Sequence, residues 1–148
     1  MSSVIGAGVS LSGIFIEDFL FPFNLKSGIT TSDVGKAVAL DTSAANTVKL
    51  AGDGDRIIGR LETVENRLSE GILVGTVSLK GGLKFPVKSG ETVAIGDTIQ
   101  GAGSGEVKTI AVSTDTDGTG TPTVKHTVHD GRNIVVEVGT GYAVVILL

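Results

Sequence analysis

Residues 72–87 read ILVGTVSLKGGLKFPV, and this stretch is the strongest indication of the fold. Its first half has the two-residue period of a β-strand, with Val74, Thr76 and Ser78 on one face and Gly75, Val77 and Leu79 on the other. The polar segment 66–71 precedes it, and Gly81 and Gly82 follow it as a turn. Pro86 cannot donate a ladder hydrogen bond, so the next strand, 83–87, is expected at a sheet edge or to end there. The stretch therefore predicts antiparallel strands joined by tight turns.

The rest of the chain after residue 37 repeats this pattern. Short Val-, Ile- and Leu-rich segments are separated by turn residues at about the 8–12-residue spacing that is typical of a sandwich or barrel. Residues 113–122, rich in Thr, Gly and Asp, are predicted to form an exposed loop. The expected strands are 38–40, 47–51, 56–65, 72–80, 83–87, 92–95, 98–100, 106–112, 123–128, 133–138 and 142–148. We predict an all-β fold with a small β-barrel or sandwich body.

Composition agrees with strands and excludes several kinds of site. Glycine accounts for 22 of 148 residues, about twice the usual share of ~7%, and each glycine inside a helix costs about 1 kcal/mol relative to alanine. The absence of cysteine excludes disulfides, thiolate metal sites and a cysteine nucleophile. A net charge of −4 gives no counterion-release drive toward DNA or RNA, so we expect no nucleic-acid partner. Glu17 and Asp18 interrupt the apolar start, which has no basic region, so we expect neither a signal peptide nor a membrane contact.

The aromatic residues are concentrated near the N-terminus. Four of the five Phe lie between residues 15 and 23, and we divide the chain into an extended N-terminal arm, 1–27, and a β body, 28–148. Burial of four Phe yields roughly 6–12 kcal/mol, less than the cost of ordering about 25 residues at about 1–2 kcal/mol each. We therefore expect the arm to order against a partner, by β-augmentation. The candidate partner-binding residues are Ile14, Phe15, Ile16, Phe19, Leu20, Phe21, Pro22 and Phe23. The alternative is that these Phe fill the protein's own core.

Motifs that would carry chemistry are incomplete. The Gly6-Ala7-Gly8 start of a dinucleotide fingerprint lacks its third glycine. The acidic segment 115–120 lacks the later ligands of a calcium loop, and His126 and His129 would face opposite sides of a strand. No Gly-x-Ser-x-Gly elbow is present. We expect no catalytic residue, no cofactor and no metal site, and hence not an enzyme.

One further pattern suggests a different class of protein. The rhythm of residues 84–98 is similar to half of a biotinyl- or lipoyl-carrier domain, but the tripeptide that presents the modified lysine in that family is absent. A carrier with Lys80 or Lys84 modified remains the enzyme-linked alternative. The intact mass after co-expression with a ligase would show or exclude such an adduct.

Over about residues 30–148 the order of short phrases resembles the decoration, or cement, proteins of tailed-bacteriophage capsids. The phrases are VGKAV (34–38), IIGRL (57–61), GTVSLKG (75–81), LKFPV (83–87), GDTI (96–99) and GYAVVILL (141–148). Two segments depart from the family pattern: residues 14–23, and residues 113–122, which look like an insertion.

The resemblance implies a structural protein with the major capsid protein as partner and a homotrimer as its assembled form. It would bind the outer surface of the phage head in the virion, after assembly in the host cytoplasm, and stabilise the head against internal pressure. The arm would then contact the capsid or a sister subunit. The alternative function is a head-fibre or spike module that binds a receptor or glycan. In the body, only Phe85 and Tyr142 could supply the aromatic surface for such binding.

Overall fold

The computed structural model describes residues 20–116, 122–127 and 131–148, and the regular elements in them are nearly all β-strands. The helical segments in these ranges are two three-residue 3₁₀ turns, η2 (Thr31–Asp33) and η3 (Leu68–Glu70). The strands are β1 (Leu20–Leu25), β2 (Ala37–Leu40), β3 (Thr47–Leu50), β4 (Gly59–Leu61), β5 (Glu65–Arg67), β6 (Ile72–Ser78), β7 (Gly81–Pro86), β8 (Ile99–Gly103), β9 (Glu106–Thr109), β10 (Val112–Thr116), β11 (Pro122–Thr127), β12 (Asn133–Gly139) and β13 (Tyr142–Leu147). The predicted all-β fold is confirmed.

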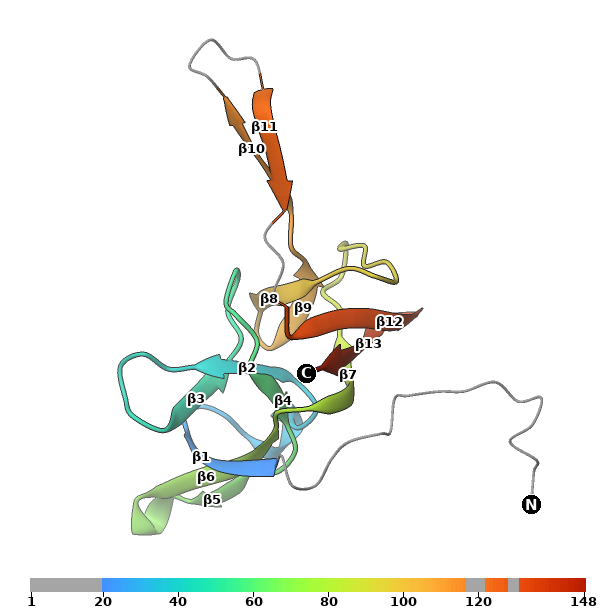
Figure 1. Ribbon diagram of the computed structural model, residues 1–148. Helices are drawn as coiled ribbons and strands as arrows, with labels where there is room; N and C mark the ends of the chain where they lie inside the picture. The colour runs from blue at the N-terminus through green and yellow to red at the C-terminus, as the bar shows by residue number, and fades with distance from the viewer. Residues whose placement is uncertain (1–19, 117–121, 128–130) are drawn as a thin grey trace, which may run out of the picture.

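Five strands close into a small barrel. β1, β3, β2, β4 and β6 are neighbours in that order, and β6 pairs with β1 to complete the ring. β1 runs parallel to β3, and the other pairs of the ring are antiparallel. β5 pairs with β6 through a hairpin in which Gly71 ends η3 in the left-handed region, at φ 76°. The barrel occupies one end of the molecule (Figure 1).

Five further strands form a second layer against the outside of this barrel. β12, β13 and β7 make a three-stranded antiparallel sheet, and β8 and β9 make a separate hairpin. An isolated bridge between Val87 and Val107 ties the end of β7 to β9. The described residues therefore form two hydrophobic cores, one inside the barrel and one between the barrel and this layer.

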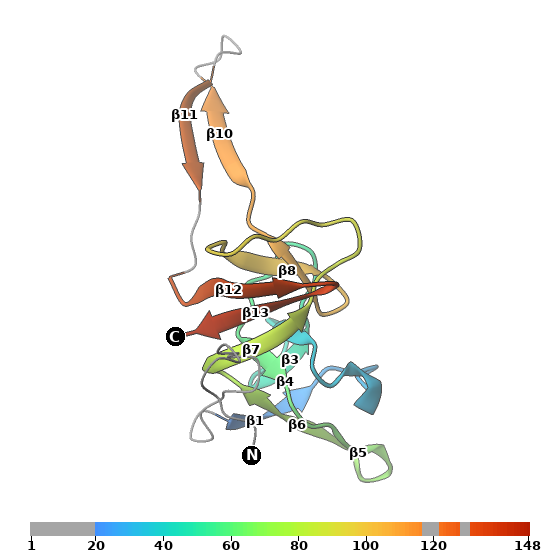
Figure 2. The ribbon, with the colours of Figure 1, turned by 90° about the vertical axis from the view of Figure 1, so that its right-hand side faces the viewer.

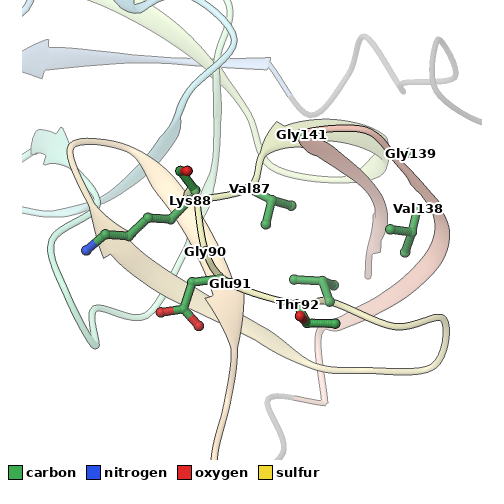
Figure 3. A pocket seen from close by; sticks show the side chains of 10 residues that line it. Val87, Lys88, Gly90, Glu91, Thr92, Val138, Gly139 and Gly141 are labelled. Carbon is green, nitrogen blue, oxygen red and sulfur yellow. The ribbon is translucent and has the colours of Figure 1, made fainter.

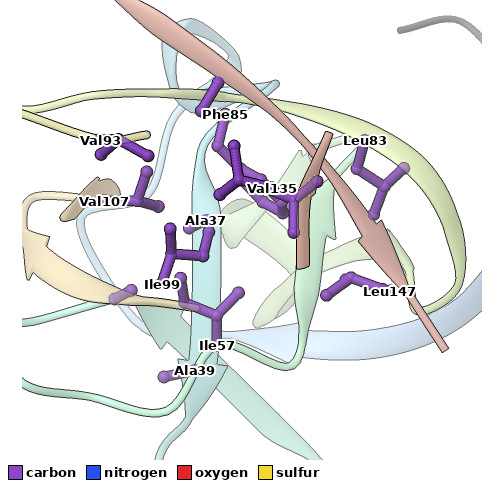
Figure 4. Packing of buried hydrophobic residues seen from close by; sticks show 13 residues of the cluster. Ala37, Ala39, Ile57, Leu83, Phe85, Val93, Ile99, Val107, Val135 and Leu147 are labelled. Atoms are coloured by element: carbon purple, nitrogen blue, oxygen red, sulfur yellow. The ribbon is translucent and has the colours of Figure 1, made fainter. Parts of the chain in front are cut away.

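β2 contributes to both cores, because successive residues of a strand point to opposite faces. Val38 lies in the barrel core with Val48, Leu61 and Val77. Ala37 and Ala39, on the other face of β2, pack into the second core. That core also contains Ala51, Ile57, Leu83, Phe85, Val93, Ile99, Val107, Val135, Ala143, Val145 and Leu147, and Figure 4 shows Ala37 and Ala39 among them.

The segment predicted as an exposed loop, 113–122, instead contributes residues 113–116 to β10 and its last residue, Pro122, to β11. β10 and β11 pair antiparallel, from Val112 opposite Thr127 to Thr116 opposite Pro122. The hairpin projects away from the rest of the molecule in both views (Figures 1 and 2). For residues 113–116 the loop prediction was wrong, because it weighed polarity above the β-branched threonines, which suit a strand. Residues 117–121 lie outside the described part of the chain.

Two local predictions are also corrected. Residues 92–95 form a loop, which Asp97 closes: the Ala94 N–H donates to the Asp97 carboxylate at 2.9 Å, and the Asp97 N–H donates to the Ala94 carbonyl at 3.1 Å. Val93 is buried in the second core, so its apolar side chain serves packing and not strand pairing. The turn predicted at Gly81 and Gly82 lies two residues earlier, at residues 79–80, and both glycines belong to β7.

We expected residues 1–27 to form an arm outside the body. In the described structure the barrel already includes part of this segment. β1 lies between β3 and β6 and closes the ring, so residues 20–25 belong to the barrel. The physical reason is that a ring of strands leaves no unpaired edge, which an open sheet would expose. Residues 1–19 lie outside the described residues.

Some of the glycine surplus allows backbones to approach closely. A Cβ added at Gly75 would overlap the Thr63 carbonyl oxygen and would lie 3.0 Å from Leu25 Cδ1 inside the barrel. A Cβ at Gly59 would overlap the Ser78 carbonyl oxygen in the same way. At both positions the obstacle is backbone, which cannot rotate away as a side chain can.

Gly75→Ala is therefore expected to destabilise the protein by about 1–3 kcal/mol through overpacking. Urea denaturation followed by circular dichroism measures this as a lower midpoint. Gly131→Ala is the control, because an added Cβ there meets no atom within 4 Å. Equal midpoints for the two variants would contradict the close approach at Gly75.

Candidate functional site

The residues predicted to bind a partner are divided by the structure. Ile14, Phe15, Ile16 and Phe19 lie outside the described residues, whereas Leu20, Phe21, Pro22 and Phe23 form the first part of β1. Cross-strand partners share a face of a sheet. Phe21 is opposite Val77 and Phe23 is opposite Gly75, so both lie on the face that turns toward the barrel interior.

Along this face of β1, burial increases with distance from the strand's start. Phe21 is 45% exposed, Phe23 is half-buried and packs against the barrel core, and Leu25 is buried in it. On the opposite face Pro22 is exposed and Leu20 is half-buried. Phe23 thus packs against the protein's own core, which was the alternative to partner binding. Phe21 and Pro22 remain accessible to a partner.

A pocket that the sequence did not predict is lined by residues of the barrel and of the second layer. We call it the Lys84 pocket; it has a volume of about 500 Å³ and joins the η2–β2 connection, β4, β7 and the β12–β13 turn. Its lining residues are Val34, Gly35, Lys36, Arg60, Lys84, Phe85, Pro86, Thr140, Gly141 and Tyr142. It combines an apolar surface with three cations.

Two of these cations already have carboxylate partners. Lys36 Nζ lies 2.8 Å from Asp33 Oδ1, and Arg60 Nε lies 2.8 Å from Glu62 Oε1. Arg60 Nη1 also donates to the Lys84 carbonyl oxygen at 3.4 Å, which ties β4 to β7. Burial raises the pKa of Asp33, but hydrogen bonds from Lys36 and from the Thr30 N–H outweigh it and hold that pKa below its ordinary value of 3.8.

Lys84 is the cation of the pocket without such a partner among the described residues. Its Nζ lies 4.0 Å from the centroid of the Tyr142 ring, where the negative ring face attracts a cation. Val144, two residues after Tyr142 on the same face of β13, is opposite Lys84 in the sheet register. The amine therefore covers one ring face of the single tyrosine of the chain.

A second pocket of about 430 Å³ lies between the 87–93 loop and the β12–β13 turn. Figure 3 shows Val87 and Val138 on two sides of it, while Lys88 extends away from them. Lys88 Nζ donates to the Ala102 carbonyl oxygen at 3.1 Å, so this cation is used within the fold. Thr92 and the glycines complete a small and largely apolar hollow.

Neither pocket brings together a nucleophile, a base and an orienting group. The described residues contain no group of three side chains that could hold a metal ion. Their buried side-chain polar atoms all have hydrogen-bond partners. Within the described ranges there is no helix of the length and hydropathy needed to cross a membrane.

Sequence reasoning missed most of the Lys84 pocket. It singled out Lys84 as a possible modified lysine, and Phe85 and Tyr142 as body aromatics, without placing them together. Lys36 and Arg60 lie far from them in sequence and carried no local signal. Comparison of the chain with protein-family models, with curated proteins and with solved structures finds no match.

Substitutions in β1 should separate its structural and accessible residues. Phe23→Ala is expected to cost about 2 kcal/mol of unfolding free energy, because it removes a half-buried ring from the barrel core. Phe21→Ala is the matched control and should cost clearly less, since 45% of that side chain is already exposed. Urea unfolding of the two variants measures the difference, and a larger loss for Phe21 would contradict the assigned faces.

The Asp33–Lys36 contact predicts a pH dependence of stability. Because the pKa of Asp33 is lower in the folded protein, the unfolded chain binds more protons as the pH falls. The contribution is present above the ordinary carboxyl pKa of 3.8 and is lost as the pH falls through the lower folded value. Asp33→Asn should therefore weaken the decline of unfolding free energy between neutral and strongly acidic pH. An unchanged decline, measured by urea unfolding at each pH, would contradict this contribution.

Proposed function

We propose that the protein is a structural decoration protein that binds the outer surface of a tailed-phage capsid and stabilises the head against internal pressure. The observation that carries the proposal is the ordered set of phrases between residues 34 and 148. In the structure these phrases coincide with framework elements: the approach to β2, β4, the β6–β7 connection, β7, the approach to β8, and β13. The likeness therefore concerns the β framework and involves no reacting group.

The proposed partners are the major capsid protein and two further copies of this chain in a homotrimer. Phe21 and Pro22 at the exposed start of β1 are available for such a contact, next to residues 14–19 of the predicted arm. Each contact can be modest, because many copies on one shell add up in avidity. The net charge of −4 suits an outer surface that does not meet the packaged genome.

The proposal is tested by mixing the purified protein with undecorated heads of the phage that encodes it and imaging them by cryo-electron microscopy. We expect added density at three-fold positions of the outer surface, and light scattering of the free protein should give the mass of a trimer. Heads without added density would overturn the proposal.

The role of the start of the chain is tested with variants that keep the barrel intact. Removal of residues 1–27 would delete β1 and open the ring, so the informative truncation removes residues 1–19 only. This truncation and Phe21→Ser are expected to lower capsid occupancy at a fixed protein concentration. Leu68→Ser is the matched control, because Leu68 is a 58% exposed apolar residue on η3, away from β1. Unchanged occupancy in both test variants would exclude this region as the anchor.

A further inference from the structure

We propose that the Lys84 pocket binds a carboxylate, presented by an aspartate or glutamate side chain of the major capsid protein. The inference rests on the proposed function, because the phage shell supplies the partner. It is carried by the charges that line the pocket, by the contacts that hold them, and by the strength of the ion pair that they can form.

The pocket carries one positive charge that is not balanced within the described residues. Lys36 and Arg60 are each paired with a carboxylate at 2.8 Å, whereas the Lys84 amine has no carboxylate partner there. Glu137, two strands from Lys84 in the same sheet, accepts a hydrogen bond from the Tyr142 hydroxyl at 3.4 Å instead of pairing with the amine. A single unbalanced cation is matched by one negative charge, as on a carboxylate, and not by a polyanion such as nucleic acid.

The Lys84 amine is held where a partner can reach it. Lys84 and Pro86 alternate with the buried Phe85 on β7, and Tyr142 of β13 is opposite Pro86. Lys84, Pro86 and Tyr142 therefore lie on the face of the sheet that points away from the second core. Lys84 is exposed, and its Nζ lies 4.0 Å from the centroid of the Tyr142 ring. An amine already positioned on a ring loses less freedom on binding than a freely moving one.

Two further residues of the lining offer donors to the same carboxylate. Arginine has five N–H donors, and Arg60 directs its Nε toward Glu62 and its Nη1 toward the Lys84 carbonyl oxygen. Its other N–H groups and the hydroxyl of Thr140, which also lines the pocket, are donors as well. Since a carboxylate has two oxygens, it can pair with Lys84 and accept a second hydrogen bond from one of these residues.

The strength of this contact indicates that the carboxylate belongs to a protein and not to a free small acid. An exposed ion pair strengthens binding by only about 1.5–5-fold, which is too little to hold a free acid in the pocket. The apolar part of the lining includes Val34, which is 44% exposed, and Pro86. A protein surface that covers these apolar atoms adds the missing affinity, and many copies on one shell act together. Under the proposed function that surface is the major capsid protein.

The second pocket lacks these properties. Its lining contains Glu91, which would repel a carboxylate. Lys88 extends away from the hollow (Figure 3), and its Nζ donates to the Ala102 carbonyl oxygen at 3.1 Å. Both Lys84 and Lys88 are exposed lysines, so exposure alone does not distinguish them. The proposal does, because it places the capsid carboxylate at Lys84 and not at Lys88.

A zero-length cross-linker tests the contact directly. A water-soluble carbodiimide joins a lysine amine to a carboxylate that touches it, and it does not join arginine. From decorated heads treated in this way we expect an amide between Lys84 and an aspartate or glutamate of the capsid protein, identified by mass spectrometry, and no such link at Lys88. Lys84→Arg keeps the charge, so this variant should keep its capsid occupancy while losing the cross-link.

Occupancy of the heads measures the contribution of the charge. Lys84→Gln is expected to weaken binding by about 1.5–5-fold for each pocket, seen as lower occupancy at a protein concentration that does not saturate the heads. Arg67→Gln is the matched control and should leave occupancy unchanged. It removes an exposed cation of β5, which is paired with Glu65 and does not line the pocket.

The possible failures are distinguishable. Heads that the unaltered protein does not decorate would overturn the proposed function and this inference together. Decorated heads with equal occupancy for Lys84→Gln, or without a Lys84 cross-link to the capsid protein, would overturn this inference alone. A Lys84 cross-link only to another copy of this chain would also overturn it, and would assign the carboxylate to a neighbouring subunit.

Discussion

The packing of β2 between two cores is the interaction on which the rest of the structure depends. Val38 points into the barrel, while Ala37 and Ala39 point into the second core, and all three are buried. The backbone of β2 is correspondingly tied on both sides: the Ala37 N–H donates to the Gly105 carbonyl at 2.9 Å, and the Ile58 N–H donates to the Val38 carbonyl at 2.9 Å. Small alanines allow the C-terminal layer to pack close to the barrel wall, so one strand joins both halves.

Glycine serves the same purpose elsewhere in the molecule. Gly59 and Gly75 let strands of the barrel approach neighbouring carbonyl oxygens, and Gly101 lets β8 approach the Gly52 carbonyl. A protein with few aromatic residues cannot fill wide spaces between layers, so its layers must lie close together. The glycine surplus and the scarcity of aromatic side chains are two aspects of one solution to packing.

Closure of the barrel by β1 also determines what is left for binding. Pairing with β3 and β6 uses the backbone of β1 and draws Phe23 and Leu25 toward the core. Phe21 and Pro22 stay exposed at the start of the strand, and the Lys84 pocket lies two strands away. The start of β1 therefore offers an apolar contact, which is where we place a proposed contact with the capsid.

Local pattern was sufficient for the β class, for most strands and for several of the turns between them, because a two-residue period and turn residues act over a few positions. It also showed that the aromatic residues gather near the N-terminus. Only the tertiary structure decided which face of β1 is buried and that residues 113–116 pair with β11. Only it could bring Lys36, Arg60, Lys84 and Tyr142 around one pocket. The reason is physical: strand closure and layer packing join residues far apart in sequence, and no local signal records that proximity.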